Sequence, residues 1–124
     1  ECEIGTLASS IQDNSEVDDV NIVKVEVKQD LNNDKFLDVV DFFRAKKNLN
    51  NERIYHHIGI YAFTTTALSK YVKLNRSKLE IKRNLEQMRA MENNMIIKTG
   101  FSDSTPLGVD TEEDLKKIIK AMNT

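Results

Sequence analysis

The fold class is decided by the stretch Asn21-Ile22-Val23-Lys24-Val25-Glu26-Val27-Lys28. Successive side chains of a strand point to opposite faces, so this order predicts a half-buried strand, with valines on one face and Lys24 and Glu26 on the other. A polar Asn/Asp cluster occupies residues 30–34, and the Val- and Phe-rich run Phe36–Phe43 follows it. We therefore expect a β-hairpin around an Asn/Asp turn.

On either side of this hairpin the chain predicts further elements. Thr6–Ile11 is expected to be structured, Arg44–Arg53 to form an exposed loop and Ile54–Thr64 to form a second strand. Thr65 or Thr66 is then expected to cap a short helix that ends near Tyr71. Strands and hairpins thus fill the first half of the chain.

The second half alternates helix, strand and helix. Ser77 is expected to cap a longer helix with apolar positions at Ile81, Leu85, Met88 and Met91. A strand is expected at Met95–Phe101, then a loop marked by Pro106 and Gly108. A final helix after an acidic first turn places its apolar residues at helical spacing, namely Leu115, Ile118, Ile119 and Met122. We predict an α/β fold: a mixed sheet with flanking helices.

Composition limits the possible functions. The 124 residues, 40% hydrophobic and 31% charged, fit one domain of 1–124. Eighteen basic against 20 acidic residues give a formal charge of −2, which argues against a nucleic-acid partner. The longest stretch without charge, Ile58–Ser69, is too short to span a membrane. Cys2 is the only cysteine, so no intrachain disulfide can form, and we expect a cytoplasmic protein.

The run His56-His57-Ile58-Gly59-Ile60-Tyr61 carries the candidate chemistry. Strand alternation places His57, Gly59 and Tyr61 on one face and Ile58, Ile60 and Ala62 on the other. A glycine between an imidazole and a phenol leaves an open floor where a ligand can reach the backbone. The alternative is a polar sheet face with Gly59 at a bulge.

Three motifs in register resemble the C-terminal half of the 3-deoxy-manno-octulosonate (Kdo) cytidylyltransferases, or CMP-Kdo synthetases. They are His-Ile-Gly-Ile-Tyr-Ala-Phe at 57–63, Leu79-Glu80 with Leu85-Glu86-Gln87-Met88-Arg89, and Gly-Val-Asp-Thr-Glu-Glu-Asp-Leu at 108–115. Gly5–Ala8 and Asn21–Val25 also look like central strands of that family. The resemblance implies the C-terminal half of a nucleotide-diphospho-sugar-transferase-like fold. It is weakest from Asp30 to Arg53, so no function is carried to Arg44.

The resemblance also implies a function. The family couples CTP and Kdo to CMP-Kdo and pyrophosphate for lipopolysaccharide biosynthesis, with Mg²⁺ and usually as a homodimer. Its sugar contacts would fall on five residues of this chain, which are His57, Gly59, Tyr61, Glu86 and Gln87. Asp110 matches a carboxylate that ligates magnesium. From position alone, Glu86 could be a solvated flank of its helix and Asp110 the N-cap of the last helix.

We expect this chain to be the sugar-binding and dimerisation half of such an enzyme and to begin inside a longer protein. The four glycines, at 5, 59, 100 and 108, are too scattered for a phosphate-binding loop, so the chain alone should be inactive. Two alternatives stay open. One is a cytidylyltransferase for another sugar acid, such as a sialic acid, and the other is a non-catalytic module that self-associates through exposed strand edges.

Overall fold

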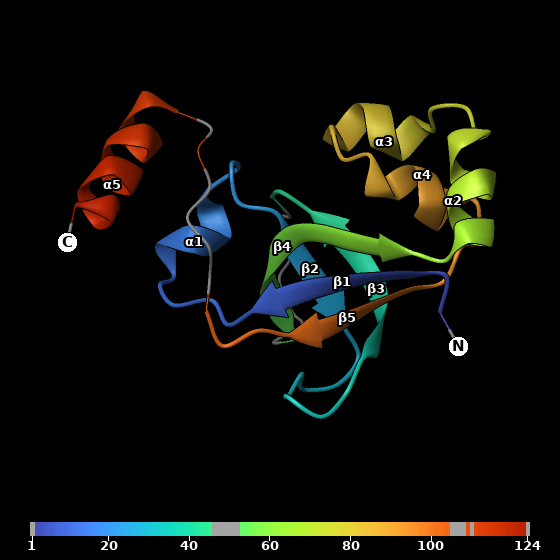
Figure 1. Ribbon diagram of the computed structural model, residues 1–124, viewed down its shortest axis with the longest axis horizontal. Coiled ribbons are helices and arrows are strands. Elements are labelled where there is room, and N and C mark those ends of the chain that lie inside the picture. Colours follow the sequence, from blue (N-terminus) through green and yellow to red (C-terminus); the bar gives the residue numbers. More distant parts are fainter. Residues whose placement is uncertain (1, 46–52, 105–108, 110, 124) are drawn as a thin grey trace.

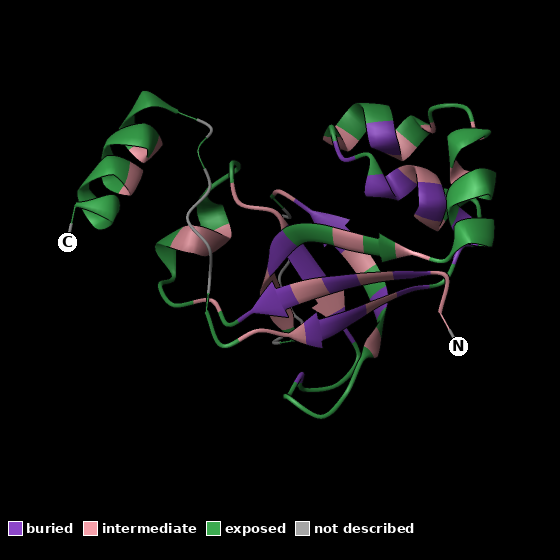
Figure 2. Ribbon diagram, in the orientation of Figure 1, coloured by how far each residue is buried: buried purple, intermediate pink, exposed green. Residues whose placement is uncertain are grey.

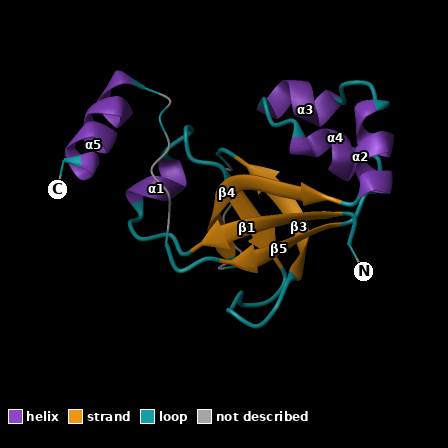
Figure 3. Cartoon of the chain, viewed as in Figure 1, coloured by secondary structure: helices purple, strands orange, loops and turns teal. Residues whose placement is uncertain are grey.

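The computed structural model describes residues 2–45, 53–104, 109 and 111–123. Its strands and helices are labelled in Figure 1 and coloured by type in Figure 3. In chain order the elements are β1 (Ile4–Ser9), α1 (Ser15–Asp18), β2 (Lys24–Val27), β3 (Leu37–Phe43), β4 (Ile54–Phe63), α2 (Thr65–Val72), α3 (Lys78–Arg83), α4 (Gln87–Glu92), β5 (Ile97–Phe101) and α5 (Glu112–Met122).

The strands form one mixed sheet that closes on itself in the order β1-β4-β2-β3-β5. β5 pairs with β1 in parallel, and the other neighbouring strands are antiparallel. The predicted hairpin is confirmed, because β2 pairs with β3 in a register that sets Val25 opposite Phe42. The predicted mixed sheet with flanking helices is confirmed as well.

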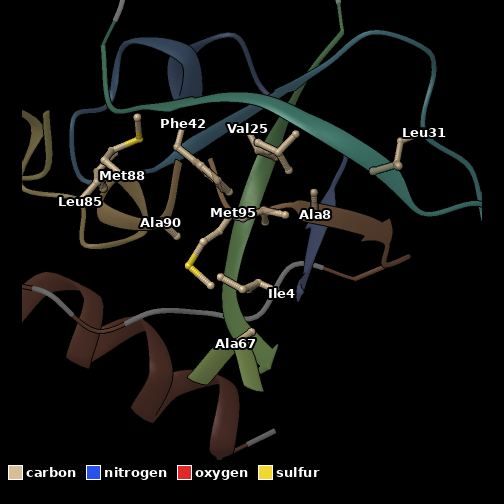
Figure 4. Packing of buried hydrophobic residues seen from close by; sticks show 12 residues of the cluster. Ile4, Ala8, Val25, Leu31, Phe42, Ala67, Leu85, Met88, Ala90 and Met95 are labelled. Atoms are coloured by element: carbon tan, nitrogen blue, oxygen red, sulfur yellow. The ribbon is translucent and has the colours of Figure 1, made fainter. Parts of the chain in front are cut away.

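The helices α2, α3 and α4 gather at one end of the sheet, and the core lies between this helical layer and the strands (Figures 1 and 2). Figure 4 shows residues from both layers packed together. Phe42 of β3 is fully buried, and Met88 of α4 is 2% exposed. Burying one such side chain contributes about 1.5 to 3 kcal/mol. The other members of the cluster are Ile4, Ala8, Val25, Leu31, Val39, Ala67, Leu85, Ala90, Met95 and Ile97.

The burial of Lys24 contradicts the simple alternation of buried and exposed side chains predicted for its strand. Its side chain was expected on the exposed face, but Lys24 is 0% exposed. The segment after α1 and the end of β3 cover it, and its ammonium group donates hydrogen bonds to the carbonyls of Asp19 and Arg44. Burial lowers the pKa of Lys24. A lysine can occupy this position because backbone carbonyls replace its water.

The helix predicted from Ser77 is in fact two helices. Ser77 does cap α3, in a capping box with Glu80. Asn84 then adopts a left-handed conformation, with a φ of 55°, and ends α3 before α4 begins. The apolar spacing therefore continues across a break in the backbone, and Ile81 is 59% exposed. The cap of α2 is likewise Thr64 rather than Thr65 or Thr66.

The final helix forms as predicted, but its apolar face is not covered. Thr111 caps α5 in a capping box with Asp114, so the N-cap is Thr111 and not Asp110. No residue of α5 is buried, and Met122 is 79% exposed. Figure 1 shows α5 at the opposite side of the molecule from α2–α4.

Two predicted loops fall partly outside the described residues: positions 46–52 of the first, and Pro106 and Gly108 of the second. Among the described residues, no helix has the length and apolar character needed to cross a membrane.

The break at Asn84 yields a stability prediction. We expect Asn84→Ala to lower the free energy of unfolding by about 1 kcal/mol, because a side chain with a Cβ is disfavoured in the left-handed region. Asn84→Gly is the matched control and should cost less, since glycine adopts this conformation freely. Urea denaturation of both variants measures the difference. Equal losses would mean that the backbone conformation does not set the break.

Candidate functional site

A bulge in β4 shapes the strand that carries the candidate site. Thr6 of β1 is opposite Tyr61 and the next residue, Leu7, is opposite Ile58, so no residue of β1 is in register with Gly59 or Ile60. The bulge that the sequence analysis gave as part of the alternative for Gly59 is therefore confirmed. It also overturns the predicted apolar face, because Ile58 is buried whereas Ile60 is 61% exposed.

His57 and Tyr61 nevertheless stay on one side of the strand, with ring centroids 5.5 Å apart. Gly59 between them is exposed, and a Cβ added there would meet nothing within 4 Å among the atoms described. The open floor that the sequence predicted at this glycine is therefore present.

The helical layer supplies the facing wall. Glu86 is the N-cap residue of α4 and Gln87 its first residue. The Tyr71 hydroxyl donates a hydrogen bond of 2.9 Å to the carbonyl of Glu86, which ties α2 to this segment. His57, Gly59, Tyr61, Glu86 and Gln87 all line one cavity of about 1040 Å³. The structure thus brings together the five residues predicted for substrate binding.

Burial keeps the two aromatic groups on the strand wall neutral. His57 is 7% exposed, and its ring meets that of Phe42 edge-on at 4.9 Å. Burial lowers the pKa of His57 to about 4, with a smaller effect from His56, so the imidazole is uncharged near pH 7. Burial also raises the pKa of Tyr61. This wall offers neutral hydrogen-bonding groups.

The helical wall carries charge that the sequence analysis missed. Arg76 and Arg89 line the cavity. Arg89 donates two hydrogen bonds to the nearly buried carboxylate of Glu80, from Nε to Oε1 at 2.9 Å and from Nη2 to Oε2 at 2.6 Å. These bonds lower the pKa of Glu80 to about 2. The Arg89 guanidinium also lies 5.0 Å from the centre of the Tyr71 ring.

Arg44 is the third arginine that lines the cavity, and its guanidinium group binds backbone carbonyls of the protein itself. It donates hydrogen bonds to the carbonyls of Val20, Arg83 and Asn84. Three arginines against Glu80 and Glu86 leave the lining with an excess of positive charge. Glu80 and Arg89 lie on different helices, so no helical spacing in the sequence signals their pairing.

His56, the neighbour of His57 in the same run, is not among the residues that line this cavity. His56 pairs with Glu16 of α1, with 3.0 Å between Nδ1 and Oε1. Asp110 lies outside the described residues, so its predicted role as a metal ligand stays a prediction. Within the described ranges, no three His, Cys, Asp or Glu side chains cluster closely enough to hold a metal ion.

Sequence comparison relates the chain to known proteins. Residues 2–99 match the family described as cytidylyltransferase. The 3-deoxy-manno-octulosonate cytidylyltransferase of Bartonella tribocorum is 42% identical over 120 residues, which are 97% of this chain and 49% of that protein. The protein of the same name from Afipia carboxidovorans is 44% identical over 114 residues, which are 92% of this chain and 45% of that one.

Structure comparison agrees. A solved CMP:2-keto-3-deoxy-manno-octonic acid synthetase, complexed with CTP, superimposes with a TM-score of 0.80 at 30% sequence identity. The match covers 98% of this chain and 49% of the other. The chain therefore spans about half the length of the relatives it matches. The match over residues 2–99 shows that the chain belongs to the cytidylyltransferase family.

Proposed function

We propose that this chain provides the sugar-acid site of a 3-deoxy-manno-octulosonate cytidylyltransferase. The complete enzyme would couple CTP and Kdo to CMP-Kdo, release pyrophosphate and serve lipopolysaccharide biosynthesis in the cytoplasm. One observation carries the proposal: residues from two separate sequence motifs, at 57–63 and 79–89, line a single cavity. Relatives with this name, 42% identical to the chain, support the choice of reaction.

The cavity chemistry fits an acid with several hydroxyl groups. His57, Tyr61 and Gln87 offer neutral donors and acceptors, which suit hydroxyl groups. Arg76 and Arg89 place two guanidinium groups beside Glu80 on the opposite wall, and guanidinium groups suit a carboxylate. A cytidylyltransferase for another sugar acid, such as a sialic acid, would use the same groups, so the identity of the sugar depends on the relatives.

Asp110 is the one residue of this chain that we propose as a ligand for magnesium. The carboxylate would be one oxygen ligand for Mg²⁺, a hard cation that also binds substrate phosphates. The described residues provide no cluster that could complete the site.

The first prediction concerns sugar binding. In calorimetric titrations of the chain with Kdo, we expect His57→Ala and Tyr61→Phe each to weaken binding about tenfold, the equivalent of one lost hydrogen bond of roughly 1.4 kcal/mol. His56→Ala is the matched control, because His56 pairs with Glu16 and is not among the residues that line the cavity. Failure of the unaltered chain to bind Kdo, or an equal loss in the control, would contradict the assignment.

The second prediction concerns turnover. With CTP, Kdo and Mg²⁺ present, we expect this chain alone to release no pyrophosphate, because its sequence contains no glycine-rich phosphate-binding loop. A coupled assay for pyrophosphate measures this. Release at about one per second, an ordinary enzymatic rate, would show that the chain holds the nucleotide site itself.

The third prediction concerns self-association. We propose a homodimer that forms through apolar surface on α2, where Leu68 is 47% and Val72 is 65% exposed. Both line a mainly apolar hollow of about 230 Å³ together with Phe63 and Ile97. Exposed apolar patches of this kind mark interaction surfaces. The alternative of a non-catalytic module that self-associates through exposed strand edges is not supported, because the sheet of the described residues closes on itself and each strand has a neighbour on both sides.

Light scattering after size exclusion tests the dimer. We expect a mass above the 14.2 kDa of one chain, and Val72→Lys should lower it. Met122→Lys on α5 is the control and should leave the mass unchanged. A monomer over a wide concentration range, or dissociation by the control alone, would contradict the proposed surface.

A further inference from the structure

Thr6 does not line the cavity, but its hydroxyl group forms a hydrogen bond with His57, which does. Thr6 lies in β1, is 2% exposed, and its Oγ1 is 2.9 Å from His57 Nε2. The same hydroxyl lies 2.7 Å from the carbonyl oxygen of Ile60 and 3.2 Å from that of Ile58. These two carbonyls flank the bulge at Gly59, so Thr6 connects the backbone distortion to the imidazole.

Proton counting assigns the hydrogen bond between Thr6 and His57. A threonine hydroxyl has one hydrogen, and carbonyl oxygens can only accept. The bond of 2.7 Å to Ile60 takes that hydrogen, and Ile58 is the second carbonyl in competition for it. Thr6 Oγ1 must therefore accept from His57, so Nε2 carries the imidazole proton. Tautomers are assigned in this way, from the hydrogen-bond network around the ring.

The second ring nitrogen is then an acceptor that no described group of the chain occupies. In a neutral imidazole with a proton on Nε2, Nδ1 holds a lone pair. Within the described part of the chain, nothing forms a hydrogen bond with His57 Nδ1. Every fully buried side-chain nitrogen or oxygen described has a partner, so Nδ1 is accessible, and His57 lines the cavity. The rings of Phe42 and Tyr61 restrict rotation of the imidazole.

We propose that Thr6 is a positioning residue that holds His57 as the Nε2–H tautomer, so that Nδ1 accepts a hydrogen bond from a ligand hydroxyl. The nature of the ligand, a sugar acid, rests on the proposed function, whereas the tautomer does not. At this point the cavity takes a hydroxyl group and disfavours a carboxylate or phosphate oxygen, since neither has a hydrogen to donate when ionised. Thr6 thereby sets specificity without touching the ligand.

Nitrogen NMR of the ¹⁵N-labelled chain without ligand tests the tautomer directly. At pH 7 we expect the bonded proton of His57 on Nε2 and none on Nδ1. Thr6→Val keeps the branched shape but removes the hydroxyl, so both tautomers should become populated. Thr6→Ser restores the hydroxyl and should restore the single tautomer. A wild-type His57 with its proton on Nδ1, or a Thr6→Val spectrum identical to the wild type, overturns the proposal.

Calorimetry with Kdo tests the consequence. We expect Thr6→Val to weaken binding about tenfold and Thr6→Ser to keep it near the wild-type value. Thr99→Val is the matched control, because Thr99 is a fully buried threonine directly opposite Thr6 on β5, and its hydroxyl bonds Gly100 instead. Equal losses in Thr6→Val and Thr99→Val would overturn the role in specificity. Absence of Kdo binding with the tautomer intact would overturn the proposed ligand and leave the positioning of His57 standing.

Discussion

The ion pair between Glu80 and Arg89 holds the helical layer together. Glu80 is 4% exposed, and a carboxylate removed from water in this way is tolerated only when it is paired and hydrogen-bonded. Arg89 supplies two bonds, and the Ser77 backbone adds a third through the capping box. The pair thus joins α3 to α4 across the break at Asn84. Together with the Tyr71 hydroxyl bond to the Glu86 carbonyl and the buried side chains of Leu85 and Met88, it positions Glu86 and Gln87 above the sheet.

The strand layer forms the other wall of the cavity, and a buried polar contact holds it in place as well. The bulge in β4 leaves Gly59 and Ile60 out of register with β1, yet Thr6 bonds the carbonyls on both sides of the bulge. One hydroxyl therefore stabilises an irregular strand and fixes an imidazole. The cavity lies where this strand faces α4, so both of its walls are set by buried polar contacts rather than by flexible loops.

The sequence predicted those features that depend on local periodicity. Valine alternation predicted the hairpin and Ser77 predicted the cap of α3, whereas the final helix was predicted from its acidic first turn and apolar spacing and its cap, Thr111, was not. Lys24 was missed because alternation cannot show that a second layer covers the polar face. The break at Asn84 was missed because apolar spacing continues across it. Arg89 was missed for a third reason: its partner Glu80 lies on another helix and becomes a neighbour only after the chain folds. Arg76 was missed although its Nε lies 3.7 Å from Glu80 Oε2 and the two residues are only four apart in the sequence.

The division of polarity between the two walls has a consequence for any ligand. Burial leaves His57 and Tyr61 uncharged, whereas the helical wall carries the arginines and both glutamates. Charge-assisted bonds are roughly twice as strong as neutral ones, so a carboxylate is drawn to the guanidinium groups. Hydroxyl groups are left to face the strand, where a lone pair on His57 and the phenol of Tyr61 can bond them. A molecule that carries both kinds of group is therefore oriented by the cavity, while one that carries only one kind is bound by a single wall.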